Sequence, residues 1–478
     1  MKLLLKLLTL LGALLIFSGS AYAQGTPAPL TGNWTGSLNV SGTTLHLVCH
    51  FTPKPDGALS GTFDSLDQGA TGLPFSAVRV TGRTVHLEAA SLGASFNGSL
   101  DAAGKTLMGH WMQGGGSLPL TLTRTDHVAS LDRPQEPHPP FPYTSTDMTF
   151  PGGASGVTLA GTLTTPLGAG PFPAVVLIAG TGRNDRDETV FGHKPFLLLA
   201  DTLTRRGIAV LRYDKRGAGK STGSYALATT ADFAADADAA VNFLKTQAAI
   251  SPKHIGLIGH SEGGMIAPLV ASEHPADIAF AVLLAGPGMN GEKIILAQSA
   301  LIARAEGATP AEIAQSAALN TQIFAVVKAE PDPAVAEAKL QKVVLHAIAA
   351  LTPAEKAQIG DPAVYAKKLG RESDSPWFRS FIVYDPLPAL QKTRCPVLAL
   401  AGSKDVQVPP TEDLALISQA LKAGGNTQIT IKELPHLNHL FQTCRTGSPS
   451  EYAKITETMA PSALAIIEDW VVGQTTAK

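Results

Sequence analysis

The stretch 254–264 reads HIGLIGHSEGG and decides the fold class. It opens with an apolar run of the length of a buried strand, and the run that follows it, 265–272, has helical periodicity. Between them, Gly259-His260-Ser261-Glu262-Gly263 has the form Gly-x-Ser-x-Gly. A serine on a sharp strand-to-helix turn is held in a strained conformation, and glycines two residues to either side avoid clashes there. The pattern predicts Ser261 as an exposed nucleophile at a helix N-terminus, which favours developing negative charge.

Apolar strand-like runs and helical runs alternate on both sides of this turn. Continuous apolar strands separated by helices predict a buried, mostly parallel sheet in an α/β domain covering residues 146–478. The segment 287–390 has no strand pattern; it is Ala-rich with helical periodicity, and helix starts stand at Thr309-Pro310 and Thr352-Pro353. We expect it to form a helical cap inserted between two core strands. The predicted strands are 174–179, 208–213, 254–258, 279–284, 397–401 and 428–433, after an opening hairpin of 148–150 and 157–163.

Residues 24–126 have a different pattern, typical of an all-β domain. Eight short segments alternate apolar and polar residues, and turn signals such as Pro55-Asp56-Gly57 separate them. This spacing predicts a small antiparallel barrel or sandwich. The Pro-rich run 133–142 lies within a predicted linker, residues 127–145.

The N-terminus has the pattern of a secretory signal peptide. Lys2 and Lys6 precede an apolar run, 7–17, and Ala21-Tyr22-Ala23 gives the Ala-x-Ala pattern of a cleavage site. We therefore expect residues 1–23 to be removed and the mature protein to be exported, periplasmic or extracellular. No later stretch reaches ~20 apolar residues, so no membrane span is expected after cleavage.

Composition and cysteine count exclude several classes of function. The net charge is −2 and charged residues make up 16%, so no basic excess points to a nucleic-acid partner. The three cysteines cannot all pair within the chain, and no Cys/His spacing resembles a zinc site. We expect neither a metal nor an organic cofactor.

A serine hydroxyl needs a base, and in this strand–turn–helix context the order along the chain is Ser, acid, His. Asp405 follows the strand 397–401 and is the predicted acid; Glu412 and Asp413 are weaker rivals because they start a helix. Two histidines follow the last strand, His436 and His439, and their spacing alone does not decide between them.

The strand 174–179 ends in a glycine-rich turn, Gly180-Thr181-Gly182. Such a turn places a backbone N–H beside the reacting carbonyl, so the N–H groups of Thr181 and Glu262 are the predicted oxyanion hole. The polar run 184–188 follows this turn. It fits a pocket mouth and an internally paired loop equally well. Candidate pocket residues are Asp185, Arg186, Asp187, His260 and Trp377.

The run 213–221 contains Gly-Lys-Ser but lacks the spacing of a phosphate-binding loop. We expect this run to order the site through contacts of Asp214 and Arg216 instead.

From about residue 146 onward the chain resembles the α/β-hydrolase superfamily, in the branch that groups serine aminopeptidase-like and acyl-ester hydrolases. In this resemblance the base is the His of Asn-His-Leu-Phe, which is His439. The first domain is similar to the β-domain that precedes some exported bacterial hydrolases. The motifs that carry the resemblance are Gly180-Thr181-Gly182, Asp185-Arg186-Asp187, Asp214-Lys215-Arg216-Gly217-Ala218-Gly219, Gly259-His260-Ser261-Glu262-Gly263-Gly264, Ser375-Pro376-Trp377-Phe378, Tyr384-Asp385-Pro386, Gly402-Ser403-Lys404-Asp405 and Asn438-His439-Leu440-Phe441.

Three functions fit these motifs. The first is a serine hydrolase that cleaves small-molecule carboxylic esters through an acyl-enzyme. The second is a serine exopeptidase of the aminopeptidase kind, with the same machinery on the same fold. The third is a non-catalytic envelope- or glycan-binding protein with an inert core. The full set of Ser, Asp and His in the expected order argues against this third function.

Overall fold

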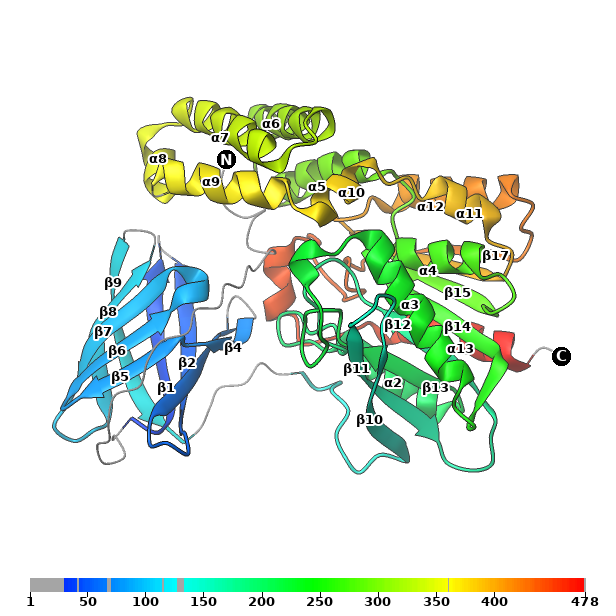
Figure 1. Ribbon diagram of the computed structural model, residues 1–478, viewed down its shortest axis with the longest axis horizontal. Helices are drawn as coiled ribbons and strands as arrows, with labels where there is room; N and C mark the ends of the chain where they lie inside the picture. The colour runs from blue at the N-terminus through cyan, green and yellow to red at the C-terminus, as the bar shows by residue number, and fades with distance from the viewer. Residues whose placement is uncertain are drawn as a thin grey trace.

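The structure, a computed structural model, describes residues 30–40, 43–66, 70–113, 116–126, 133–359 and 361–476. The predicted signal peptide, residues 1–23, lies outside them. The described residues form one sheet of nine strands and one of eight (Figure 1). The expected class, an all-β domain followed by an α/β domain, is confirmed. None of the described helices is long and apolar enough to cross a membrane.

The nine-stranded sheet of the first domain is antiparallel, in the order β4-β3-β2-β1-β9-β8-β7-β6-β5. It curls so that β3 and β5 approach each other, around a core drawn entirely from residues 30–122. Eight strands coincide with the predicted segments, whereas β4, with Gly72 and Pro74, carries no alternation and was missed. The strands are β1 (Gly32–Val40), β2 (Thr43–Pro53), β3 (Leu59–Ser65), β4 (Ala70–Pro74), β5 (Ala77–Thr81), β6 (Thr84–Ala89), β7 (Ala94–Leu100), β8 (Thr106–Gln113) and β9 (Gly116–Thr125).

The second sheet has the order β10-β11-β13-β12-β14-β15-β16-β17, and only the first two strands, β10 and β11, run antiparallel to their neighbours. Ser261 follows β14, and loops with acid and base candidates follow β16 and β17. The fold is that of the α/β hydrolases. The strands are β10 (Tyr143–Pro151), β11 (Thr158–Pro166), β12 (Phe172–Ile178), β13 (Ala209–Tyr213), β14 (Ile250–His260), β15 (Phe280–Leu284), β16 (Val397–Gly402) and β17 (Ile429–Leu434).

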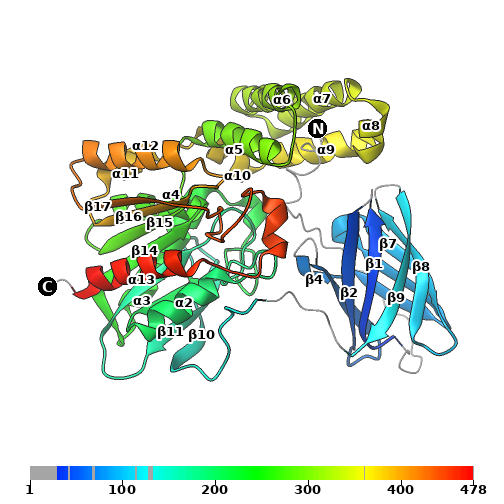
Figure 2. The same ribbon diagram turned by 180° about the vertical axis from the view of Figure 1, so that it is seen from behind.

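Helices cover both faces of this sheet, which explains why its central strands β12, β15 and β16 are apolar along nearly their whole length rather than alternating. Val175 and Leu177 of β12 pack into one core, and Val176 between them packs into the other. The cover on the side of Val176 is α3 (Thr230–Lys245), α4 (Glu262–Glu273), α11 (Leu387–Lys392) and α12 (Pro410–Ala423); on the other side it is α2 (Pro195–Arg205) and α13 (Pro461–Thr476), seen in Figure 2.

Six helices fill the insertion between β15 and α11. Side chains of Asn290, Thr309, Asp332, Asp361 and Ser375 cap five of them by accepting backbone N–H groups. Ile323 and Phe324 are buried in the insertion's own apolar core. The helices are α5 (Gly291–Ala305), α6 (Pro310–Ala329), α7 (Pro333–Ala349), α8 (Pro353–Ile359), α9 (Pro362–Ser373) and α10 (Pro376–Val383).

The predicted linker is bound to the α/β domain over its second half. The buried Arg133 guanidinium donates to the carbonyls of Phe191, Ala453 and Ile455 at 2.7, 3.0 and 3.0 Å. Gln135 accepts the backbone N–H of Thr458 at 2.6 Å. Arg133 onward therefore belongs structurally to the α/β domain.

Removal of residues 24–126 should leave an α/β domain that folds with the same unfolding midpoint as in the full chain. The reason is that the core of the β-domain contains no residue of the α/β domain. Extending the deletion through Pro142 should lower the free energy of unfolding by about 2 kcal/mol or more, since hydrogen bonds from a charged donor contribute about 1.5–3 kcal/mol each. Denaturant titration followed by circular dichroism measures both. Equal stability of the two deletions would contradict the anchoring role of Arg133.

Candidate active site

Ser261 lies on a strained turn between β14 and α4, at φ 54° and ψ −118°. A non-glycine residue with positive φ costs of order 1–3 kcal/mol, and such strain persists only where the surroundings impose it. The flanking glycines show how this is imposed. A Cβ on Gly259 would lie 1.9 Å from the carbonyl oxygen of Gly263, and one on Gly263 would lie 2.0 Å from that of Ile178. The turn therefore packs against the end of β12 with no space for side chains on those two glycines.

The loops after β16 and β17 bring Asp405 and His439 together. His439 Nδ1 lies 2.7 Å from Asp405 Oδ2, and both side chains are buried. The other oxygen, Oδ1, accepts the backbone N–H groups of Gln407 and Val408 at 2.8 and 2.9 Å. A carboxylate held in this way fixes the imidazole with its Nδ1 proton toward the acid, which leaves Nε2 to accept a proton.

His439 also lies against the serine turn. The residue beside the serine, His260, donates from Nε2 to the carbonyl of His439 at 3.0 Å, and the two rings are 4.8 Å apart between centroids. No hydrogen bond reaches the Ser261 hydroxyl from the part of the chain that the structure describes. Bonds of this kind tighten on substrate binding, so an open geometry is compatible with a nucleophile–base pair.

The rival acids and base lie elsewhere. His436 is exposed at a turn with φ 63°, and Glu412 is exposed on α12. Asp413 is buried and accepts the backbone N–H groups of Gly288 and Met289 at 2.6 and 2.8 Å; burial raises its pKa to about 6. Asp413 thus fixes the entrance to the cap, not the imidazole.

The predicted oxyanion donors flank the serine. Glu262 is the first residue of α4, where backbone N–H groups have no partner within the helix. Gly180 precedes Thr181, and a Cβ on it would lie 3.0 Å from Ser261 Cβ. The Gly180–Thr181 peptide and the N-terminus of α4 therefore stand next to the nucleophile, where charge would develop on a tetrahedral oxygen.

Glu188, the last residue of the polar run 184–188, makes a contact that the sequence pattern did not predict. Its Oε1 accepts the N–H of Gly180 at 2.6 Å and lies 3.0 Å from His260 Nδ1. Burial disfavours a charged His260, but the Glu188 carboxylate, the His439 carbonyl and the charge of Asp405 together outweigh burial and raise the pKa of His260. This pair connects the oxyanion turn to the His439 loop. No local signal marks it, because Glu188 stands 72 residues from its partner.

The remaining candidate pocket residues are engaged within the protein. Asp185 accepts from the backbone and hydroxyl of Thr189, Arg186 pairs with Asp214 at 2.9 Å, and Asp187 pairs with Arg212. The polar run is thus paired partly within its own loop and partly with Arg212 and Asp214 at the end of β13. Trp377 of α10 is buried and donates from Nε1 to the Glu262 carboxylate at 2.7 Å, which ties the cap to the serine turn.

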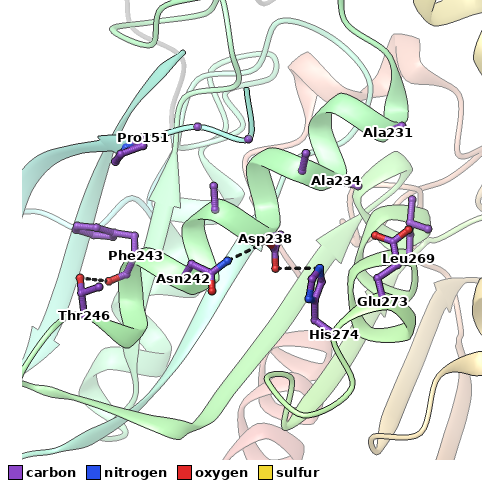
Figure 3. A pocket seen from close by; sticks show the side chains of 14 residues that line it. Pro151, Ala231, Ala234, Asp238, Asn242, Phe243, Thr246, Leu269, Glu273 and His274 are labelled. Atoms are coloured by element: carbon purple, nitrogen blue, oxygen red, sulfur yellow. Dashed lines mark hydrogen bonds and ion pairs between the residues drawn. The ribbon is translucent and has the colours of Figure 1, made fainter. Parts of the chain in front are cut away.

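A surface hollow of about 590 Å³ lies apart from these residues, along α3 (Figure 3). Its wall includes alanines of α3 and Phe243, and its polar side includes Asp238, which faces His274. It shares no residue with the serine turn or the acid–base pair. Among the described residues, no group of three or more His, Cys, Asp or Glu side chains is placed to hold a metal ion.

Comparison with known proteins gives two sequence similarities. The model of the family described as "Serine aminopeptidase, S33" matches residues 194–350, which include Ser261 but neither Asp405 nor His439. Esterase EstD from Thermotoga maritima is 29% identical over 297 residues, which cover 62% of this chain. The chain spans 61% of the length of that relative.

Solved structures with similarity to the chain include the α/β hydrolase GrgF from Penicillium sp. sh18, with 19% identity and a TM-score of 0.43 over 70% of this chain and 100% of that one. Proline iminopeptidase from Mycobacterium smegmatis has 17% identity and a TM-score of 0.42 over 69% and 99%. With such low scores, the fold assignment rests on the strand order itself.

His439→Ala should abolish covalent labelling of Ser261 by a fluorophosphonate probe, because an isolated serine hydroxyl is a weak nucleophile. His436→Ala is the matched control and should label at the wild-type rate, since its ring is exposed at a turn. Labelling rates followed by gel fluorescence measure both. Loss of labelling in the His436 variant alone would reassign the base.

Proposed function

We propose that this chain is a serine hydrolase that cleaves carboxylic esters of small molecules through an acyl-enzyme. The observation that carries the proposal is the position of Ser261 on a strained turn beside the buried Asp405–His439 pair, 2.7 Å between Nδ1 and Oδ2. The similarity to a protein named as an esterase supports the ester class.

In the proposed reaction, His439 Nε2 takes the proton of Ser261 as its oxygen attacks the ester carbonyl. Asp405 holds the imidazole tautomer and stabilises the imidazolium. The N–H groups of Thr181 and Glu262 stabilise the oxyanion, and His439 then protonates the leaving alcohol. Water then attacks the acyl carbon as it gives a proton to His439. The bond between the acyl carbon and the Ser261 oxygen breaks, His439 returns the proton to that oxygen, and the acid is released. These steps draw on side chains, backbone N–H groups and water alone.

Ser261→Ala should lower kcat for a nitrophenyl ester by ~10⁴-fold or more, because removal of one triad member costs nearly the whole triad effect. The fold should persist, since the structure gives this hydroxyl no hydrogen bond from the described residues. Steady-state rates and a thermal melt check the two parts. Substantial turnover by the folded variant would reject Ser261 as the nucleophile.

An aminopeptidase is the second candidate, supported by the description of the matching family. Such an enzyme must anchor a substrate ammonium group with carboxylates that converge on the pocket. The core-side carboxylates Asp185 and Asp187 are engaged with Thr189 and Arg212. Glu188 Oε1 is engaged with His260, and its Oε2 is buried with no hydrogen-bond partner among the described residues. This engagement favours the ester reaction.

We therefore expect kcat/KM for short and medium acyl nitrophenyl esters well above that for aminoacyl-nitroanilides. The measurement is a matched series of both substrates, with N-acetylated nitroanilides as the control for recognition of the free amine. Preference for the nitroanilides that disappears on acetylation would replace the esterase by an aminopeptidase.

We also propose that the protein acts after export, in the periplasm or outside the cell, on the pattern of residues 1–23. Fractionation of cells that express the full chain, followed by N-terminal sequencing from Gln24, tests this location.

A further inference from the structure

Both backbone polar groups of Gly180 are held by buried side chains of opposite charge. Its N–H donates to Glu188 Oε1 at 2.6 Å. Its carbonyl accepts from Lys215 Nζ at 2.6 Å and from Asn184 Nδ2 at 2.8 Å. Gly180 is thereby fixed from two sides next to the nucleophile.

This fixation orients the predicted oxyanion donor. The carbonyl of Gly180 and the N–H of Thr181 belong to one planar trans peptide unit, so they point in opposite directions. Because the carbonyl points at Lys215, the N–H of Thr181 points away from Lys215. The peptide lies against the serine, since a Cβ on Gly180 would be 3.0 Å from Ser261 Cβ.

Lys215 also holds the other half of the oxyanion hole. Its ammonium lies 3.1 Å from Glu262 Oε2, and the two side chains are 4% and 0% exposed. The second carboxylate oxygen of Glu262 accepts from Trp377 Nε1 and Thr230 Oγ1 at 2.7 and 2.8 Å. The residue that supplies the second backbone N–H is therefore fixed by the same ammonium.

The apolar surroundings of the Lys215 ammonium strengthen its hydrogen bond to the Gly180 carbonyl. Lys215 Nζ lies 4.1 Å from the ring centre of Phe233, and the residue is buried from water. In such a low-dielectric site a hydrogen bond to a carbonyl polarises its peptide unit and strengthens the N–H at the other end as a donor. The hydrogen bond from Lys215 therefore both orients the Thr181 N–H and strengthens it as a donor.

We propose that Lys215 is a positioning residue for the oxyanion hole, which aligns and polarises the Gly180–Thr181 peptide and pairs with Glu262 to fix the N-terminus of α4. This inference rests on the proposed ester hydrolysis. Lys215 acts through backbone groups and does not touch the substrate.

The test is the double variant Lys215→Met/Glu262→Gln, which removes both charges and keeps side-chain lengths, so that no unpaired charge is buried. We expect kcat for nitrophenyl acetate to fall ~10–100-fold with KM little changed, less than the 10²–10³-fold cost of deleting a donor outright. The rate preference for this ester over its thionoester should shrink, because an anionic sulfur gains little from aligned N–H donors. A merely structural role would not change that preference.

The matched control is Lys245→Met/Asp277→Asn, which removes a Lys–Asp pair at 2.7 Å. It should leave kcat, KM and the preference for the ester over the thionoester unchanged. Thermal melts of both variants confirm that folded protein is compared. A folded Lys215→Met/Glu262→Gln variant with wild-type kcat and ester preference would overturn the inference. If the wild-type chain hydrolyses no ester, the proposed function fails instead.

Discussion

The contact between Gly263 and the carbonyl of Ile178 leaves no space for a side chain, and the geometry of the site follows from it. Because α4 begins directly against the end of β12, the chain must reverse within one residue, and Ser261 takes the positive φ. The same closeness places the turn after β12 beside the serine. Backbone packing at the carboxyl ends of parallel strands thus positions the proposed nucleophile and the proposed oxyanion donors.

Buried charged side chains, together with the backbone packing, hold the loops of the site in place. Glu188, Lys215 and Glu262 have their hydrogen bonds inside the protein, and each connects two segments distant in sequence. A buried charge left without its partner is costly, so such groups hold the loops in one arrangement. Trp377 extends this network into the cap, so the cap and the serine turn share a hydrogen bond.

Local periodicity was sufficient to predict the central strands of the α/β domain, such as β12, β15 and β16, because each is a continuous apolar run. It failed for β4, a short edge strand with Gly72 and Pro74 and no alternation. Spacing alone could not choose between His436 and His439, whereas the geometry places Asp405 against His439. Glu188 and Arg133 left no local signal, since their partners lie tens to hundreds of residues away.

The Glu188–His260 pair constrains how this sequence can drift. Replacement of Glu188 by a neutral residue leaves the buried His260 ring without its carboxylate partner, and replacement of His260 leaves the buried Glu188 carboxylate without the ring. Each single substitution gives a less stable protein, although the double substitution can be tolerated. Across descendants of this chain, the two positions should therefore change together, and their covariation would reveal the contact even where no structure exists.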